Sequence, residues 1–286
     1  MSIDLHTHST ASDGTFTPTQ LVRHAKELGL SAIALTDHDT FSGLDEAREA
    51  GEYYGVEVIR GCELSLESPA GAGWLHMVAL WVPENPTELQ EAIDWVIEGR
   101  LTRNHEIVEK LRAQGVNITY EAVAARADGT IGRPHFAQEL VHLGVVSSIN
   151  EAFQVWIGDN GRAYVPKRKL KPKQALDILN NIGATSILAH PFALGLNMKQ
   201  TEKLVAEFKE MGLDGLEVIY SEHSEEQTKG YWDMAVRHNL LISGGSDFHG
   251  EVKPHIELGT GKGGLHVPDE LLMAMKERRK DRGLPV

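Results

Sequence analysis

The sequence has only one cysteine, Cys62, in 286 residues, so an internal disulfide is excluded. A reducing compartment such as the cytoplasm fits this cysteine usage. Long apolar runs are also absent, because no stretch approaches the roughly 18 residues of a membrane-spanning helix. The first residues lack the basic segment and apolar core of a secretory signal. We therefore expect a cytoplasmic protein with no membrane partner.

Positive charge is scarce too. The chain has 28 Lys and Arg residues against 41 Asp and Glu residues, a net charge of −13. Such an acidic surface is not expected to bind a polyanion broadly, so long duplex nucleic acid is excluded as a partner. One segment, 162–173, departs from this pattern, with six basic residues and no acidic one. Its basic residues are Arg162, Lys167, Arg168, Lys169, Lys171 and Lys173. Phosphate recognition, if any, must therefore be local.

Short apolar runs alternate with amphipathic helical segments in the first and last parts of the chain. The run 32–36 is typical of a strand buried on both faces of a parallel sheet. The predicted strands are 3–5, 32–36, 56–59, 74–82, 185–189, 216–220 and 240–243. The predicted helices among and after them are 18–28, 41–54, 172–181, 201–211, 227–238 and 268–278. Repeated strand–helix units imply a parallel sheet, and this number of them predicts an α/β fold with a closed or nearly closed barrel.

The alternation breaks between about residues 87 and 161, where the pattern is helical throughout. Helices are predicted at 89–114, 120–127, 135–143 and 149–157. We therefore predict a barrel domain formed by residues 1–86 and 170–286. An all-α insertion, residues 87–169, interrupts it.

Histidines and carboxylates gather where the predicted strands end. His6 and His8 are two residues apart on an extended strand, so both imidazoles point the same way and can reach one metal ion. The other candidates at strand ends are His38, Glu63, His190, Asp247 and His249, while His76 lies within the fourth predicted strand and Asp13 in the first loop. The carboxyl ends of parallel barrel strands meet at one mouth.

This ligand set also indicates a kind of chemistry. Imidazole and carboxylate without thiolate suit Zn, Mn or Fe. The candidates outnumber the ligands of a simple zinc site, so two or three divalent ions are expected. Metal clusters of this kind serve hydrolysis, in which paired ions activate a water.

Several of these residues fall in motifs: His6-Thr7-His8 with Asp13-Gly14, Thr36-Asp37-His38-Asp39, Gly61-Cys62-Glu63, Leu188-Ala189-His190-Pro191 and Ser246-Asp247-Phe248-His249. In this order and spacing they resemble the PHP (polymerase and histidinol phosphatase) family of metal-dependent phosphoesterases. The insertion carries Gly132-Arg133-Pro134-His135-Phe136 and Tyr164-Val165-Pro166-Lys167. These stretches resemble the branch that dephosphorylates 3′,5′-bisphosphonucleotides or trims RNA from its 5′ end.

The resemblance implies a distorted seven-stranded (β/α)7 TIM-like barrel with a trinuclear metal site. His6, His8, Glu63 and Asp247 would hold the first ion. Glu63 would bridge to a second ion held by His76 and His190. Asp13, His38 and His249 would hold the third. Glu63, Asp247 and His190 are the predicted catalytic residues, and a metal-bridged hydroxide would attack the phosphorus.

A phosphorylated nucleotide or a short oligonucleotide is the expected partner. The predicted substrate-binding residues are Arg133, His135, Arg162 and Lys167. Arginine matches phosphate oxygens through a bidentate fork, whereas lysine acts as a point charge. We expect the insertion to cover the mouth of the barrel. Asp37 and Asp39 are candidates for orienting histidines, and a structural role is favoured for Glu217 and His223.

Three other functions remain open. Histidinol-phosphate phosphatase activity also occurs in the family, although the insertion favours the nucleotide branch. Amidohydrolases share His-x-His on a first strand, but they place a lysine at a central strand end, and no predicted strand end here has one. A non-catalytic, metal-stabilised nucleic-acid-binding module is the alternative from another class.

Overall fold

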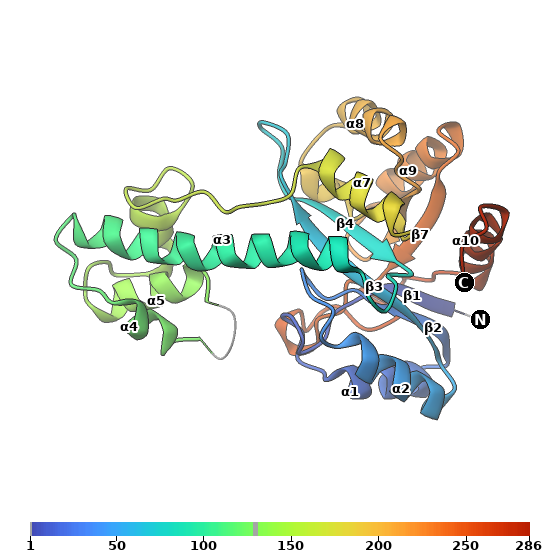
Figure 1. The fold of residues 1–286 in the computed structure, drawn as a ribbon, viewed down its shortest axis with the longest axis horizontal. Helices are drawn as coiled ribbons and strands as arrows, with labels where there is room; N and C mark the ends of the chain where they lie inside the picture. Colours follow the sequence, from blue (N-terminus) through green and yellow to red (C-terminus); the bar gives the residue numbers. More distant parts are fainter. Residues whose placement is uncertain (1, 128–130) are drawn as a thin grey trace. The chain divides into compact units, whose positions relative to one another are not determined.

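The computed structural model describes residues 2–127 and 131–286 (Figure 1). The chain divides into two compact units. The barrel unit comprises Met1–Glu91 and Leu170–Val286, and the helical unit comprises Ala92–Lys169. None of the helices in the described part of the chain is both long and apolar enough to cross a lipid bilayer.

The barrel unit contains a seven-stranded sheet with its strands in sequence order. The strands are β1 (Ser2–Thr7), β2 (Leu30–Leu35), β3 (Glu57–Leu66), β4 (Leu75–Leu80), β5 (Thr185–Leu188), β6 (Gly215–Tyr220) and β7 (Leu241–Gly245). The chain after β7 returns to β1: the Asp247 N–H donates to the His6 carbonyl at 2.9 Å, and Thr7 pairs with Phe248. The sheet therefore almost closes on itself, which confirms the predicted α/β barrel.

The direction of β4 differs from the prediction. Repeated strand–helix units implied a fully parallel sheet, but β4 runs antiparallel to both β3 and β5. The connection 67–74 is too short for the helical crossover that parallel neighbours require. As a result, the start of β4, where His76 is the second residue, lies beside the carboxyl ends of the parallel strands.

β3 is also longer than the predicted strand 56–59. Its first part, Glu57–Arg60, pairs with β2, and its second part, Gly61–Leu66, pairs with β4. Glu63 therefore lies within a strand that has neighbours on both sides, and not in a loop after it. This placement fixes the Glu63 backbone more firmly than a loop would.

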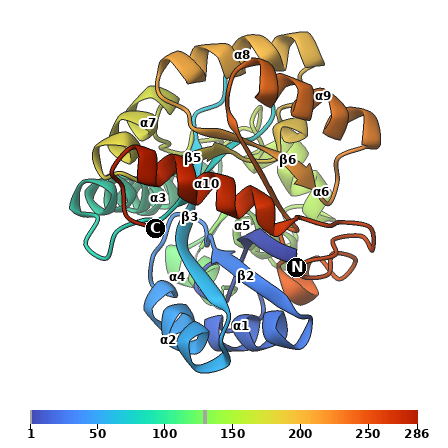
Figure 2. The same ribbon diagram turned by 90° about the vertical axis from the view of Figure 1, so that its right-hand side faces the viewer.

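Helices surround the barrel and close one of its ends. They are α1 (Pro18–Glu27), α2 (Leu44–Tyr54), α7 (Pro172–Asn181), α8 (Met198–Glu210), α9 (Glu225–Arg237) and α10 (Asp269–Asp281). Figure 2 shows α10 crossing one end of the barrel, near both chain termini. Leu272 and Met275 of α10 pack with Ile3 and Leu241, which lie near the starts of β1 and β7. The opposite end, at the carboxyl ends of the strands, is left for a site.

The helical unit has its own core, which includes the buried residues Leu111, Val123, Phe136 and Leu140. Its helices are α3 (Thr87–Arg112, which begins in the barrel unit), α4 (Tyr120–Ala124), α5 (Arg133–His142) and α6 (Ile149–Ala152). The predicted helix 149–157 changes at Phe153 into a π-helical turn, Phe153–Ile157. No strand occurs in the described part of this unit.

Gly61 stands where β3 changes partners, two residues before Glu63. A Cβ at this position would lie 2.8 Å from Thr36 Cγ2 and 2.9 Å from the carbonyl oxygens of Leu35 and Ala79. Glycine therefore lets three backbones approach closely at the level of the site.

We predict that Gly61→Ala destabilises the protein by about 1–3 kcal/mol, because the added methyl group must displace backbone atoms. Urea unfolding monitored by circular dichroism measures this loss. Gly264→Ala is the matched control, since a Cβ there meets nothing within 4 Å and its φ is not positive. Equal unfolding midpoints for the two variants would contradict the steric argument.

Candidate metal centre

Glu63 is the hub of the polar cluster at the mouth of the barrel, and its side chain is only 1% exposed. Imidazoles from several strand ends approach both of its carboxylate oxygens. Oε2 lies 3.3 Å from His6 Nε2, 3.3 Å from His8 Nε2 and 3.1 Å from His38 Nδ1. Oε1 lies 2.9 Å from both His76 Nδ1 and His190 Nε2. The antiparallel course of β4 is what brings His76 to this point.

Asp247 uses its two carboxylate oxygens differently. Oδ1 faces the histidines, 3.2 Å from His8 Nε2 and 3.7 Å from His6 Nε2. Oδ2 accepts hydrogen bonds from the Tyr220 hydroxyl at 2.8 Å and from the Lys253 ammonium at 2.6 Å. Only Oδ1 is therefore directed at the cluster.

Asp13 joins the cluster from the loop after β1. Its Oδ1 lies 3.3 Å from His249 Nε2, and its Oδ2 lies 3.9 Å from His38 Nε2. The loop is held by Asp37, which accepts hydrogen bonds from the Ser9 N–H at 2.8 Å, the Ser9 hydroxyl at 2.7 Å and the Ser12 hydroxyl at 2.6 Å. The hydrogen bonds of Asp37 thus anchor the loop that carries Asp13, and the suggestion that Asp37 orients a histidine is wrong.

The candidate ligand atoms fall into three groups, each within 4.8 Å of one another. The groups are His6, His8, Glu63 and Asp247; His8, Asp13, His38 and His249; and His38, Glu63 and His76. Glu63, His8 and His38 each belong to two groups. His190 is in none of them, although its Nε2 lies against Glu63 Oε1. The structure thus gathers every predicted metal ligand around one mouth.

The buried ring nitrogens of the cluster are suited to a cation. His6 Nε2, both nitrogens of His8 and His38 Nδ1 are buried without a hydrogen-bond partner. Burying a polar atom without a partner costs free energy, and such atoms are rare in native proteins. Divalent ions would satisfy them, and a nitrogen-and-oxygen donor set suits Zn, Mn or Fe.

The pKa shifts within the cluster also indicate a site for cations. Burial opposes a charge on His6, yet the carboxylates of Glu217 and Glu63 raise its pKa well above the ordinary value. Burial likewise opposes a charge on His8, but the nearby carboxylates of Asp247 and Glu63 raise its pKa to about 9. Burial would raise the pKa of Glu63 as well, but neighbouring histidines hold it well below its usual range. The buried carboxylates therefore stay ionised and require positive charge beside them.

The backbone is irregular where it carries these side chains. His190 has a φ of 26° and Asp247 a φ of 58°, values that side-chain-bearing residues rarely adopt. The pairing of β1 with β2 also shifts between Asp4 and Thr7, next to His6. Irregular backbone of this kind re-aims side chains and is common at functional sites.

Glu217 supports the cluster from β6. Its Oε1 accepts a hydrogen bond from His6 Nδ1 at 2.9 Å, and its Oε2 accepts one from the His190 backbone N–H at 2.6 Å. The first bond places the proton on Nδ1, which leaves the Nε2 lone pair of His6 directed at the cluster. The sequence held a signal for this role, a carboxylate inside the apolar run 216–220. Asp39, the other candidate, accepts a hydrogen bond from the Ser65 N–H at 3.0 Å.

The predicted substrate-binding residues lie in the helical unit, among aromatic side chains. Arg133 pairs with Asp159 at 2.7 Å, and its guanidinium lies 5.9 Å from the Tyr164 ring centroid. The Arg162 guanidinium lies 5.4 Å from the Trp156 ring centroid.

The other two predicted residues are His135 and Lys167, and a buried arginine lies in the same unit. Lys167 also lies in this unit, and His135 Nδ1 accepts a hydrogen bond from the Gly132 N–H at 3.0 Å. Arg103, which the sequence did not single out, is buried in the same unit, and burial and the nearby Arg133 lower its pKa to about 10. Contact of these residues with the substrate stays a prediction.

A nearly closed seven-stranded barrel with a histidine and carboxylate cluster at its mouth is the architecture of a metal-dependent hydrolase. The family model described as the PHP domain matches residues 4–182. The chain belongs to the PHP domain family.

Known relatives cover almost the whole chain. A 5′-3′ exoribonuclease of Haemophilus influenzae is 35% identical over 246 residues, which are 86% of this chain and 89% of the relative. A 3′,5′-nucleoside bisphosphate phosphatase of Chromobacterium violaceum is 31% identical and is matched over 87% of each chain. Among solved structures, a protein of Bifidobacterium adolescentis provisionally described as a metal-dependent phosphoesterase has a TM-score of 0.75 and 32% identity, with 96% of each chain covered.

We predict that Glu217→Ala weakens divalent-metal binding about 10- to 100-fold, because His6 loses the partner that orients its ring. Competition of the protein with a chelator for Mn²⁺ or Zn²⁺ measures the affinity. Glu217→Gln keeps an acceptor and should show a smaller loss. Glu222→Ala, which removes a partly exposed partner of Lys262, is the control. Wild-type affinity in Glu217→Ala would show that this carboxylate does not orient a ligand.

Proposed function

We propose that this enzyme hydrolyses a phosphate ester of a nucleotide, either the 3′-phosphate of a 3′,5′-bisphosphonucleotide or the 5′ end of a short RNA. The observation that carries the proposal is the position of Glu63, with histidines against both carboxylate oxygens. A carboxylate placed this way suits a bridge between metal ions. The names of relatives at 31–35% identity support the choice of substrate.

The assignment of ligands follows the groups around Glu63. One ion would be held by His6, His8, Glu63 and Asp247, a second by Glu63, His76 and His190, and a third by Asp13, His38 and His249. Divalent ions in such sites activate a water and polarise the phosphoryl oxygens. The geometry is equally compatible with two ions, in which case fewer of these side chains would be ligands.

Neighbouring side chains hold the proposed catalytic residues in position. Glu63, Asp247 and His190 are the proposed catalytic residues, since all three are buried and face the common centre. Tyr220 and Lys253 hold Oδ2 of Asp247, so that Oδ1 remains directed inward. Glu217 fixes both the His6 ring and the His190 backbone. This preorganisation reduces the rearrangement needed when charge develops on the phosphoryl group.

We further propose that the helical unit covers the mouth of the barrel and binds the phosphate that is not cleaved. Arg133, His135, Arg162 and Lys167 would contact it. Arginines beside aromatic rings are held in place, and a held guanidinium loses less entropy when it binds a phosphate.

A phosphate-release screen tests the function. Purified protein with added Mn²⁺ is given 3′,5′-bisphosphonucleotides, mononucleotides, a 5′-phosphorylated short RNA and histidinol phosphate, and the metal content of the same sample is measured. We expect turnover of the bisphosphonucleotide or the RNA. Turnover of histidinol phosphate alone, or of none of these compounds in metal-loaded protein, would overturn the proposal.

Glu63→Gln should lower kcat by on the order of 100-fold or more, because a neutral amide is a poor metal bridge. Steady-state kinetics and metal analysis together check this outcome. Glu57→Gln, in the same strand but at the other end and paired with Lys276, is the control. Full metal content with normal turnover in Glu63→Gln would remove the bridging role.

Arg133→Ala should raise KM for a bisphosphonucleotide about 10- to 100-fold, as expected for a lost charge-assisted hydrogen bond. Metal content should stay unchanged. Arg112→Ala removes an exposed arginine of the same unit, which pairs with Glu109, and should have little effect. If KM is the same in both variants, Arg133 does not bind the substrate.

A further inference from the structure

Trp74 carries a large exposed side chain immediately before β4. Its relative exposure is 71%, whereas Leu75, the next residue, is fully buried. We infer that the Trp74 indole stacks on the nucleobase of the substrate and so contributes to substrate affinity. The inference rests on the proposed function, since a base is present only if the substrate is a nucleotide.

The alternation of β4 places Trp74 on the side of the metal centre. Val78 and Leu80 belong to the apolar core inside the barrel, and His76, on the same face, reaches Glu63. Trp74 directly precedes the first residue of β4, and its N–H still pairs with the neighbouring segment at the Ala193 carbonyl. Continuing the alternation of the strand by this one residue assigns Trp74 to the face of His76. It lies two residues farther out, about 7 Å along the strand direction. Trp74 therefore stands at the rim, just beyond a candidate ligand.

The backbone at Trp74 is fixed to the segment that carries His190. The Trp74 N–H donates to the Ala193 carbonyl at 3.0 Å, and the Gly73 N–H donates to the Leu194 carbonyl at 2.7 Å. Both carbonyls belong to the 3₁₀ turn Pro191–Leu194, which follows His190 directly. A Cβ at residue 73 would collide with the Ala193 carbonyl oxygen, so glycine permits this close contact. The backbone that carries the indole is thus held by hydrogen bonds to the turn that follows His190.

Aromatic side chains line the rim beside this turn. Phe192 is half-buried, and its ring centroid lies 5.7 Å from that of Tyr220, whose hydroxyl reaches Asp247. Every nucleobase has a π-face, so an aromatic rim accepts different bases without reading their edges. A nucleotide whose phosphate is at the metal centre has its base within reach of this rim.

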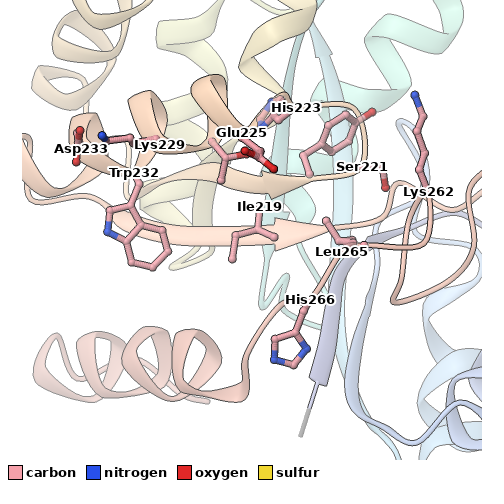
Figure 3. A pocket seen from close by; sticks show the side chains of 13 residues that line it. Ile219, Ser221, His223, Glu225, Lys229, Trp232, Asp233, Lys262, Leu265 and His266 are labelled. Atoms are coloured by element: carbon pink, nitrogen blue, oxygen red, sulfur yellow. The ribbon is translucent and has the colours of Figure 1, made fainter.

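A competing place for the base is the groove in Figure 3, which has a volume of about 730 Å³. Ile219, Trp232 and Leu265 are among its lining residues. Tyr220 lines this groove and also donates to Asp247, so the buried phenol stands between the groove and the metal centre. We favour the rim because Trp74 is 71% exposed, whereas Trp232 of the groove is 40% exposed.

The experiment compares Trp74→Ala and Trp74→Phe on two substrates, adenosine 3′,5′-bisphosphate and ribose 3,5-bisphosphate, which lacks the base. Stacking is worth about 1–3 kcal/mol per base, so Trp74→Ala should raise KM for the nucleotide roughly 5- to 150-fold with kcat largely unchanged. KM for the sugar bisphosphate should not change. Trp74→Phe, which keeps a ring, should recover most of the affinity.

Two exposed aromatic residues serve as controls. Tyr53, on α2, is 82% exposed, and Trp232, in the groove, is 40% exposed. Alanine at either position should leave both KM values at the wild-type level. A rise of the nucleotide KM in Trp232→Ala, with none in Trp74→Ala, would place the base in the groove and overturn the inference.

Failure of base stacking at Trp74 and failure of the proposed function give different results. If Trp74→Ala raises both KM values equally, or neither, the indole does not recognise the base. If metal-loaded wild-type protein turns over neither of these compounds nor the 5′-phosphorylated short RNA, the proposed function fails. Calorimetric titration with adenosine 3′,5′-bisphosphate then still tests Trp74, since weaker binding to Trp74→Ala supports stacking and equal binding overturns it.

Discussion

The site depends on one unfavourable burial, that of the Glu63 carboxylate. A carboxylate that is 1% exposed must be matched by positive charge, because desolvation of an unpaired ion is very costly. The ring nitrogens around Glu63 supply this charge as protonated imidazoles or, when neutral, as ligands of cations. Burial in the barrel mouth therefore selects for histidine at the surrounding strand ends. It also links folding of this region to metal binding.

The barrel topology explains how residues so distant in the chain meet at Glu63. Parallel strands deliver His6, His38 and His190 from their carboxyl ends, and the reversed β4 delivers His76 from its beginning. Glu63 pairs with β4 on one side and bridges to His38, just after β2, on the other, so its backbone is held on both sides. A loop residue would be less well placed to serve several ligand groups at once.

Much of the fold and the location of the candidate ligands could be predicted from the sequence, because local patterns report strands and their ends. The direction of β4 could not, since a strand looks the same in either direction and only the short connection 67–74 hinted at a reversal. Glu217 was underrated because its partners, His6 and the backbone of His190, are far away in sequence. The Tyr220 contact with Asp247 joins residues 27 apart in sequence, and the Lys253 contact depends on how the chain turns after β7.

The two units differ in the sign of the charges that they bring close together. The barrel unit concentrates buried carboxylates, which attract cations and repel an anionic substrate until metal ions are bound. The helical unit concentrates arginines, and Arg103 is buried close enough to Arg133 for their charges to repel. An anion between such groups would relieve this repulsion, as a cation does among carboxylates. Cations in the barrel unit and an anion in the helical unit would thus each lower the electrostatic cost of the charges buried in that unit.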